Sequence, residues 1–129
     1  MHKQKFFLSS GALFALLAVA CGAFGAHALE TRLAEAGNTG VWDTAVRYQM
    51  WHALALLTLG AMGAGSNNTV TAPAATGVLF CAGILLFSGS LYLLALGGPG
   101  WLGPVTPVGG LCFLAGWALL LADSLRSRA

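Results

Sequence analysis

Charged residues are what this sequence lacks most. Residues 48–122 contain no Asp, Glu, Lys or Arg. Over the 129 residues, 8% are charged, 57% are hydrophobic, and the mean hydropathy is +0.79. A soluble domain needs charged side chains over its surface, so this composition excludes a water-soluble globular protein. We therefore expect residues 1–129 to form a single integral membrane domain.

Residues that carry out chemistry are also scarce. Cys21, Cys81 and Cys112 fall in apolar stretches, and their spacing predicts neither a disulfide framework nor a metal site. The acidic residues lie outside the apolar stretches, so no Ser-His-Asp set can be assembled. No glycine-rich segment is followed by Lys-Ser or Lys-Thr, as a phosphate-binding loop requires. We expect no enzyme activity, no catalytic residue, no metal site, no cofactor and no nucleic-acid binding.

Long apolar stretches separated by turn-forming residues dominate the rest of the chain. A membrane-spanning helix needs about 20 mostly apolar residues. The stretches that meet this requirement cover residues 6–26, 45–65, 72–96 and 104–122. The breaks between them cover residues 30–44, 66–71 and 97–107. The runs lack the two-residue alternation of barrel strands, so we predict an all-α polytopic membrane protein, a bundle of four transmembrane helices.

Basic residues indicate the orientation of these spans. Positive charges flank the first and last spans at the two ends of the chain, at Lys3, Lys5, Arg126 and Arg128. On the opposite side lie only Arg32, beside two glutamates, and Arg47. Because Lys and Arg are enriched in cytoplasmic segments, we expect a multi-pass protein of the bacterial inner membrane with both termini in the cytoplasm.

The first span also resembles a secretory signal peptide. Ala26-His27-Ala28 fits an Ala-x-Ala cleavage site after a basic start and an apolar run. However, the run over residues 6–26 is longer than the ~7–15 residues of a signal core. We therefore expect the first helix to be retained.

Small residues at four-residue spacing indicate close helix packing. Examples are Gly11 with Ala15, Gly22 with Ala26, and Gly60 with Ala64. Such pairs form shallow grooves in which a second helix can approach closely. Tight packing of this kind leaves little room for a wide aqueous pore.

A polar cluster marks the start of the second span, with a histidine at the end of the first nearby. Its candidate functional residues are His27, Arg47, Tyr48, Gln49 and His52, with Asp43 one turn before Arg47. Polar groups in lipid must be paired, so these side chains should face the bundle. The interpretation that we favour is a hydrogen-bonded network that holds the first two helices together. A proton relay, a ligand site, or haem or metal binding between His27 and His52 remain alternatives.

A second polar patch lies in the third span, at Ser88, Ser90 and Tyr92. Hydroxyl groups at such positions bond to a neighbouring helix or to their own backbone, so we interpret this patch as helix packing. Aromatic side chains near the predicted outer ends of the spans, at Trp42, Trp51, Trp101 and Tyr92, are expected to anchor the protein at the membrane interface.

Four motifs occur in order along the chain. They are Gly22-Ala23-Phe24-Gly25-Ala26-His27-Ala28-Leu29, then Trp42 through Tyr48-Gln49 to His52-Ala53-Leu54-Ala55, then Phe87-Ser88-Gly89-Ser90-Leu91-Tyr92, and finally Thr106-Pro107-Val108-Gly109-Gly110. Together they resemble the YgdD-like family of small bacterial inner-membrane proteins, a domain of unknown function with eukaryotic transmembrane relatives. The resemblance implies a four-helix inner-membrane protein but supplies no mechanism. It adds Pro107 to the candidate residues in the two polar groups.

Two functions from different classes follow from these patterns. The first is a non-enzymatic structural or accessory protein that acts through membrane lipids, a protein partner or further copies of itself. The second is a small oligomeric transporter or channel, in which His52 would couple protons because no acidic residue lies within the spans.

Overall fold

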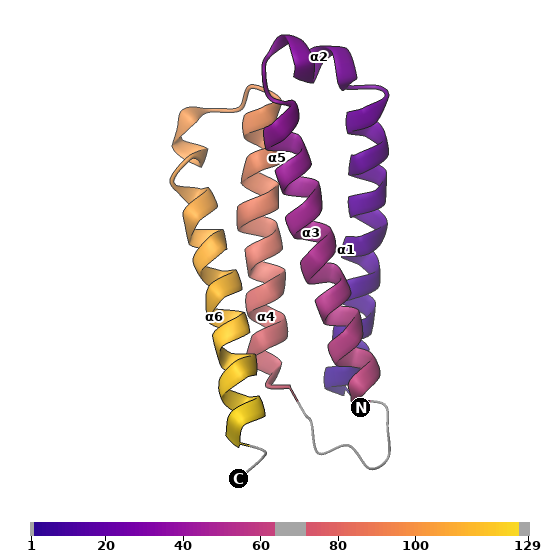
Figure 1. The fold of residues 1–129 in the computed structure, drawn as a ribbon, viewed down its shortest axis with the longest axis vertical. Helices are drawn as coiled ribbons and strands as arrows, with labels where there is room; N and C mark the ends of the chain where they lie inside the picture. Colours follow the sequence, from indigo (N-terminus) through magenta and orange to yellow (C-terminus); the bar gives the residue numbers. More distant parts are fainter. Residues whose placement is uncertain (1, 64–71, 127–129) are drawn as a thin grey trace.

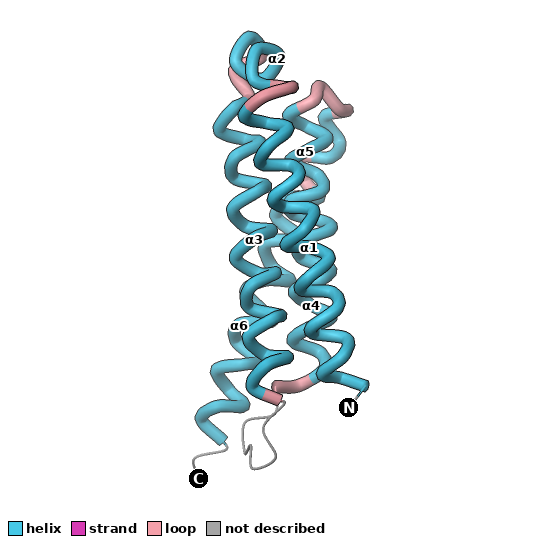
Figure 2. The backbone as a smooth tube through the Cα atoms, turned by 90° about the vertical axis from the view of Figure 1, so that its right-hand side faces the viewer, coloured by secondary structure: helices cyan, strands magenta, loops and turns pink. Residues whose placement is uncertain are grey.

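The computed structural model describes residues 2–63 and 72–126, and over these ranges it is helical without strands (Figures 1 and 2). The long helices are α1 (His2–Ala26), α3 (Thr39–Met62), α6 (Val105–Arg126), and a continuous column of α4 (Ala74–Gly83), the π-helical turn η1 (Ile84–Ser88) and α5 (Gly89–Ala95). The short helix α2 (Glu30–Glu35) crosses one end, which we call the α2 end. Both chain termini lie at the other end, which we call the terminal end.

Three of the long helices are long and apolar enough to cross a membrane, namely His2–Ala26, Ala74–Ala95 and Gly100–Arg126. They correspond to the predicted spans 6–26, 72–96 and 104–122. The predicted span 45–65 corresponds to α3, which is long enough but is not among these candidates. Its first half carries charged and polar side chains, including Arg47, Gln49 and His52, which lower its apolar character.

The predicted break over residues 30–44 is wrong, because α2 and the first turns of α3 occupy it. Leu33 is 1% exposed, so α2 is held against the long helices by burial of this side chain. The chain leaves α2 at Gly37, whose φ of 67° is a left-handed conformation that glycine adopts without strain. The polar composition of this segment predicts a loop. In the structure, burial of Leu33 holds a helix in place, and Gly37 allows the tight reversal that follows it.

The break over residues 97–107 is also shorter than predicted. It contains the 3₁₀ turn η2 (Gly100–Leu102) and the first turn of α6. Pro107 lies in that first turn, where a helix tolerates proline because the missing N–H would have no partner in the helix. The predicted break at 66–71 and the basic residue Arg128 lie outside the described residues.

Helix α3 is the centre of the arrangement. It lies closely along α1, and on another side it packs against η1 and α5, while α6 packs against α4 and η1. Helices α3 and α6 stand farther apart and meet through side chains, while α1 and α5 are linked through Gln49 of α3. The bundle is therefore skewed, with a groove along each of two sides.

Glycine allows the close approach of α1 to α3. A Cβ atom added to Gly11 would lie 2.9 Å from the carbonyl oxygen of Ala53 and 2.9 Å from the backbone nitrogen of Leu57. On α3, a Cβ atom added to Gly60 would lie 2.7 Å from the side chain of Leu8. The predicted contact role of Gly11 and Gly60 is thus confirmed for this helix pair.

Two apolar clusters lie at the two ends of the bundle. The cluster towards the terminal end contains Phe7, Leu56, Leu59, Ala72, Phe80, Ile84 and Phe113. The cluster at the α2 end contains Leu33, Trp42 and Ala95. Between them, the buried Gln49, His52 and Ser88 form a polar layer centred on α3. This layer is the candidate functional site.

We predict that Gly11→Ala lowers the free energy of unfolding by about 1–3 kcal/mol, because the new methyl group meets backbone atoms of α3 that cannot move aside. The measurement is an SDS titration of the protein in mixed micelles. Gly89→Ala is the matched control, since a Cβ there meets no atom within 4 Å. Equal stability of the two variants would contradict glycine-dependent packing of α1 on α3.

Candidate functional site

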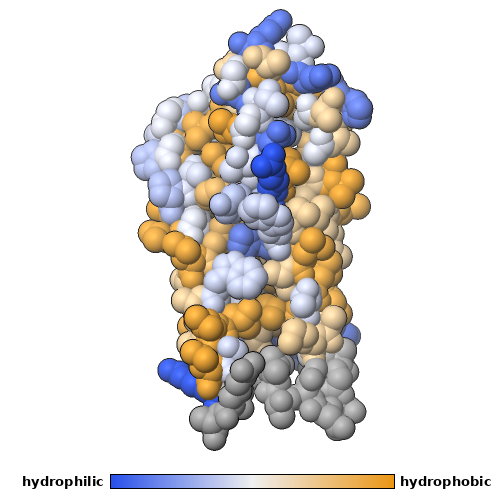
Figure 3. Space-filling model, viewed as in Figure 1, coloured by the Kyte–Doolittle hydropathy of each residue, from blue (hydrophilic) through white to orange (hydrophobic). Residues whose placement is uncertain are grey.

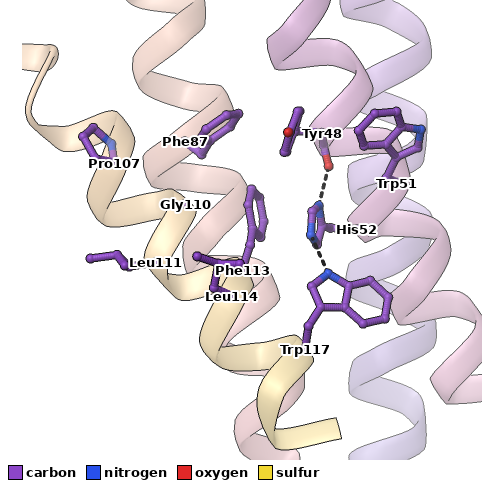
Figure 4. A pocket seen from close by; sticks show the side chains of 10 residues that line it. All are labelled: Tyr48, Trp51, His52, Phe87, Pro107, Gly110, Leu111, Phe113, Leu114 and Trp117. Atoms are coloured by element: carbon purple, nitrogen blue, oxygen red, sulfur yellow. Dashed lines mark hydrogen bonds between the residues drawn. The ribbon is translucent and has the colours of Figure 1, made fainter. Parts of the chain in front are cut away.

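His52 connects α3 to α6 across the gap between them. Its Nδ1 atom lies 2.7 Å from the carbonyl oxygen of Tyr48, and the indole N–H of Trp117 donates to its Nε2 atom at 3.1 Å (Figure 4). The imidazole ring stacks on Phe113 with ring centroids 3.5 Å apart and an angle of 10° between the planes. The side chain is 4% exposed. Both ring nitrogens therefore have partners within the protein.

These partners determine which nitrogen carries the proton. A carbonyl oxygen can only accept a hydrogen bond, and an indole N–H can only donate one. Nδ1 must therefore donate to Tyr48, and Nε2 must accept from Trp117. The geometry fits a neutral imidazole with its proton on Nδ1.

An apolar groove opens outside this histidine, between α3 and α6. Its volume is about 600 Å³. The lining residues are Tyr48, Trp51, His52, Phe87, Pro107, Gly110, Leu111, Phe113, Leu114 and Trp117 (Figure 4). Trp51 is 54% exposed and Leu114 is 66% exposed, so the groove is open to the surroundings of the helices. It has an aromatic floor and aliphatic walls.

Gln49 lies three residues before His52, on a neighbouring face of α3 that is turned towards α1 and α5. Its amide nitrogen donates to the carbonyl oxygen of Phe14 in α1 at 2.9 Å, and its amide oxygen accepts from the hydroxyl of Tyr92 in α5 at 2.8 Å. The side chain is 4% exposed. Gln49 thus joins three helices beneath a second, smaller groove of about 230 Å³.

The predicted serine patch joins helices as well. Ser88, which is fully buried, donates to the carbonyl oxygen of Ala45 at 2.7 Å. The hydroxyls of Ser90 and Thr106 lie 2.6 Å apart and link α5 to α6. The π-helical turn η1 ends at Ser88, and such turns add a residue to the helix and so change which side chains face a neighbour. Ser88 and Tyr92 both reach α3 after this turn.

Two of the predicted interface anchors make contacts inside the protein. Trp42 is 6% exposed, and its indole N–H donates to the carbonyl oxygen of Cys21 at 2.9 Å. Tyr92 packs edge-on against Trp42, with ring centroids 4.7 Å apart. Trp42 is therefore a buried packing residue and not an interface anchor, whereas Tyr92 is half-buried and its anchoring role stays a prediction. Trp51 and Trp101 are exposed, at 54% and 69%.

His27 does not lie beside His52. Gly11 of α1 packs on Ala53, the residue after His52, so His52 lies at the depth of Gly11. His27 lies two residues after Gly25, which packs on Trp42. Ten residues of α3 separate those levels, a rise of about 15 Å. Among the described residues no three His, Cys, Asp or Glu side chains gather as metal ligands. Two histidines so far apart do not fit a single haem or metal ion.

Asp43 and Arg47 are exposed, at four-residue spacing on α3. Within the described part of the chain, neither side chain forms an ion pair or a hydrogen bond. These two charges are therefore available to a partner outside the protein. They differ in this from Gln49 and His52, whose polar groups are bonded internally.

Sequence reasoning missed Phe113 and Trp117, which complete the His52 site from α6. Their four-residue spacing places both rings on one face of that helix, which is a detectable signal. Both residue types also occur commonly in apolar spans, however, so the spacing alone did not indicate a contact with a histidine in another helix.

Comparison with known proteins gives consistent matches over nearly the whole chain. A family profile described as "Protein of unknown function (DUF423)" matches residues 21–110. A UPF0382 membrane protein of Staphylococcus haemolyticus is 42% identical over 95% of this chain and 98% of its own length. The UPF0382 membrane protein YwdK of Bacillus subtilis is 40% identical over the same shares of the two chains. No solved structure matches significantly.

We predict that ¹⁵N NMR of the labelled protein shows Nδ1 of His52 protonated and Nε2 unprotonated, as its two partners require. Trp117→Phe keeps the aromatic ring but removes the donor, so the Nε2 signal should move towards that of a free acceptor. The matched control is Trp51→Phe, because Trp51 lines the same groove without a hydrogen bond to His52. A protonated Nε2 in the unmodified protein would contradict this site geometry.

Proposed function

Because this chain belongs to the DUF423 family, whose function is unknown, we propose from its own structure that it is a non-enzymatic accessory protein of the bacterial inner membrane. It holds a lipid or protein partner in the groove between α3 and α6. Homologues in Staphylococcus and Bacillus are named membrane proteins. The narrower YgdD-like resemblance stays a prediction.

The observation that carries this proposal is the position of the groove. It lies between two long helices, and its rim residues Leu111, Leu114 and Trp51 are exposed. In a membrane these side chains face acyl chains or a neighbouring helix. A groove of this kind receives an apolar partner from the side, without passage through water.

The bonding of the polar layer supports a binding role over a catalytic one. His52, Gln49 and Ser88 each use their polar groups to join helices. A general base or a proton relay needs a nitrogen or oxygen that can reach a substrate or a water chain. These three side chains instead hold the groove in a defined shape.

We further propose that all four helical columns span the membrane, α3 included, with both termini in the cytoplasm. Helix α3 contains 24 residues, a length of about 36 Å, which exceeds the ~30 Å of the hydrocarbon layer. Its polar groups at Gln49 and His52 are paired internally, which lowers the cost of placing them in lipid. Lys3, Lys5 and Arg126 at the terminal end agree with the positive-inside rule.

This topology predicts opposite labelling of two variants that each add one cysteine. Glu35→Cys, on exposed α2, should react with an impermeant maleimide in intact spheroplasts, and Lys3→Cys should react only in inverted vesicles. The unmodified chain, whose cysteines are all partly buried, gives the background. Labelling of both variants from the same side would overturn the four-span proposal.

If the groove holds a partner, the purified protein should retain a bound species, and filling the groove should remove it. Native mass spectra of the protein released gently from its own membrane should show a retained lipid or foreign subunit. Gly110→Leu should remove it, because a Cβ at Gly110 meets Phe87 only at ordinary contact distance and the longer side chain then fills the groove.

Ala115→Leu places the same side chain at an exposed position of α6 outside the groove lining, so it should retain the bound species. Leu114→Trp fills the groove from a second position, so the test does not depend on the correct folding of the Gly110→Leu variant alone. Retention of the bound species by both groove variants would overturn the proposed function.

A further inference from the structure

Building on the proposed groove function, we infer that the occupant is an ethanolamine phospholipid. One acyl chain lies in the groove between α3 and α6, its phosphate binds Arg47, and its ammonium group binds Asp43. Three independent features carry this assignment: an unpaired arginine, the order of two charges along α3, and the size of the groove.

Arg47 is the first feature. A charged side chain within a spanning helix costs about 2.5–3.5 kcal/mol at its centre on insertion scales, and such residues are normally paired or face water. Arg47 is exposed, and within the described part of the chain it forms no ion pair or hydrogen bond. A guanidinium group matches the geometry of a phosphate and binds it with two hydrogen bonds. A lipid phosphate therefore supplies the partner that the protein does not.

The order of charges is the second feature. Asp43, Arg47 and Trp51 follow one another at four-residue spacing, so they form a ridge that winds around α3 by about 40° at each step. Of the three, Trp51 lines the groove. Figure 3 shows blue and pale side chains down the middle of the face drawn there, with orange apolar side chains on the right and at the lower left. Side chains on a helix tilt towards its N-terminus, so the Arg47 side chain leans towards the α2 end and the headgroup region.

This order selects a headgroup. The negative Asp43 lies one turn farther out than the positive Arg47, a rise of about 6 Å. In an ethanolamine phospholipid the phosphate is attached to the glycerol and the ammonium group lies beyond it. The ammonium group thus lies opposite Asp43 when the phosphate lies opposite Arg47. A glycerol headgroup has no cation for Asp43, and a trimethylated ammonium group has no N–H to donate.

The groove dimensions are the third feature. From Pro107 to Trp117 the lining residues of α6 rise about 15 Å, which is half of the ~30 Å hydrocarbon layer and so the depth of one leaflet. The groove is open to one side, and its volume is about 600 Å³. An acyl chain is thin enough, and the aromatic floor at Phe113 and Phe87 offers it an apolar surface.

The test measures binding of defined lipids to the delipidated full-length protein by native mass spectrometry. The probes are ethanolamine, glycerol and choline phospholipids with identical acyl chains. The unmodified protein should prefer the ethanolamine lipid. Asp43→Asn should reduce that preference by about fivefold, which corresponds to the loss of about one net hydrogen bond.

Arg47→Gln should weaken binding of all three lipids, because each contains the phosphate. Gly110→Leu should abolish binding, and Ala115→Leu should leave it unchanged. Glu35→Gln removes an exposed negative charge from α2, away from the groove, and serves as the charge control for Asp43→Asn.

The outcomes separate this inference from the function on which it rests. If Gly110→Leu abolishes binding but Asp43→Asn leaves the headgroup preference unchanged and Arg47→Gln leaves the lipid affinity unchanged, the lipid assignment is wrong and the groove function stands. If a foreign protein subunit occupies the groove instead, the lipid assignment is also overturned. If the groove variants change nothing, both proposals fail together.

Discussion

Buried polar groups need hydrogen-bond partners inside the protein, and this requirement explains why α3 lies among other helices. Each unpaired group would cost several kcal/mol, and α3 carries an amide and an imidazole near its middle. The amide of Gln49 reaches α1 and α5 on one side, while the imidazole of His52 reaches α6 on another. The helix with the most polar side chains therefore has the most helical neighbours.

The grooves follow from the same bonds. Glycine lets α1 approach α3 backbone to backbone, whereas α3 and α6 are held apart by the imidazole, the Phe113 ring and the Trp117 indole between them. Large aromatic side chains keep two helices at a distance, and hydrogen bonds fix that distance. A lateral cavity is the result of this spacing. The contacts that hold α3 to α6 therefore also form the groove between them.

Charges and polar groups serve different purposes on this helix. Gln49 and His52 are buried and bonded, so they contribute to the arrangement of the helices. Asp43 and Arg47 are exposed, and in the described part of the chain they have no protein partner. This contrast separates the residues that shape the groove from those that we assign to a ligand, although all four belong to a single predicted cluster.

Much of the architecture could be predicted from local sequence. The absence of charge over residues 48–122 places the chain in a membrane, and the apolar runs locate three helices that can span it, because span length and hydropathy are local properties. The α2 helix was missed because burial of Leu33 depends on neighbours distant in sequence.

The membership of the site was decided only by the tertiary structure. Spacing along one helix puts Tyr48 beside His52, but it cannot show that Trp117 meets His52 across a groove or that His27 lies a different depth away. Those relations depend on how far apart and in what register the helices pack, which the glycine contacts and interhelical hydrogen bonds determine. The sequence by itself determined that the protein resides in a membrane, that it is helical, and which polar residues are available for pairing, because these properties depend on composition and local spacing. Their partners, and the groove between α3 and α6, depended on contacts between distant segments.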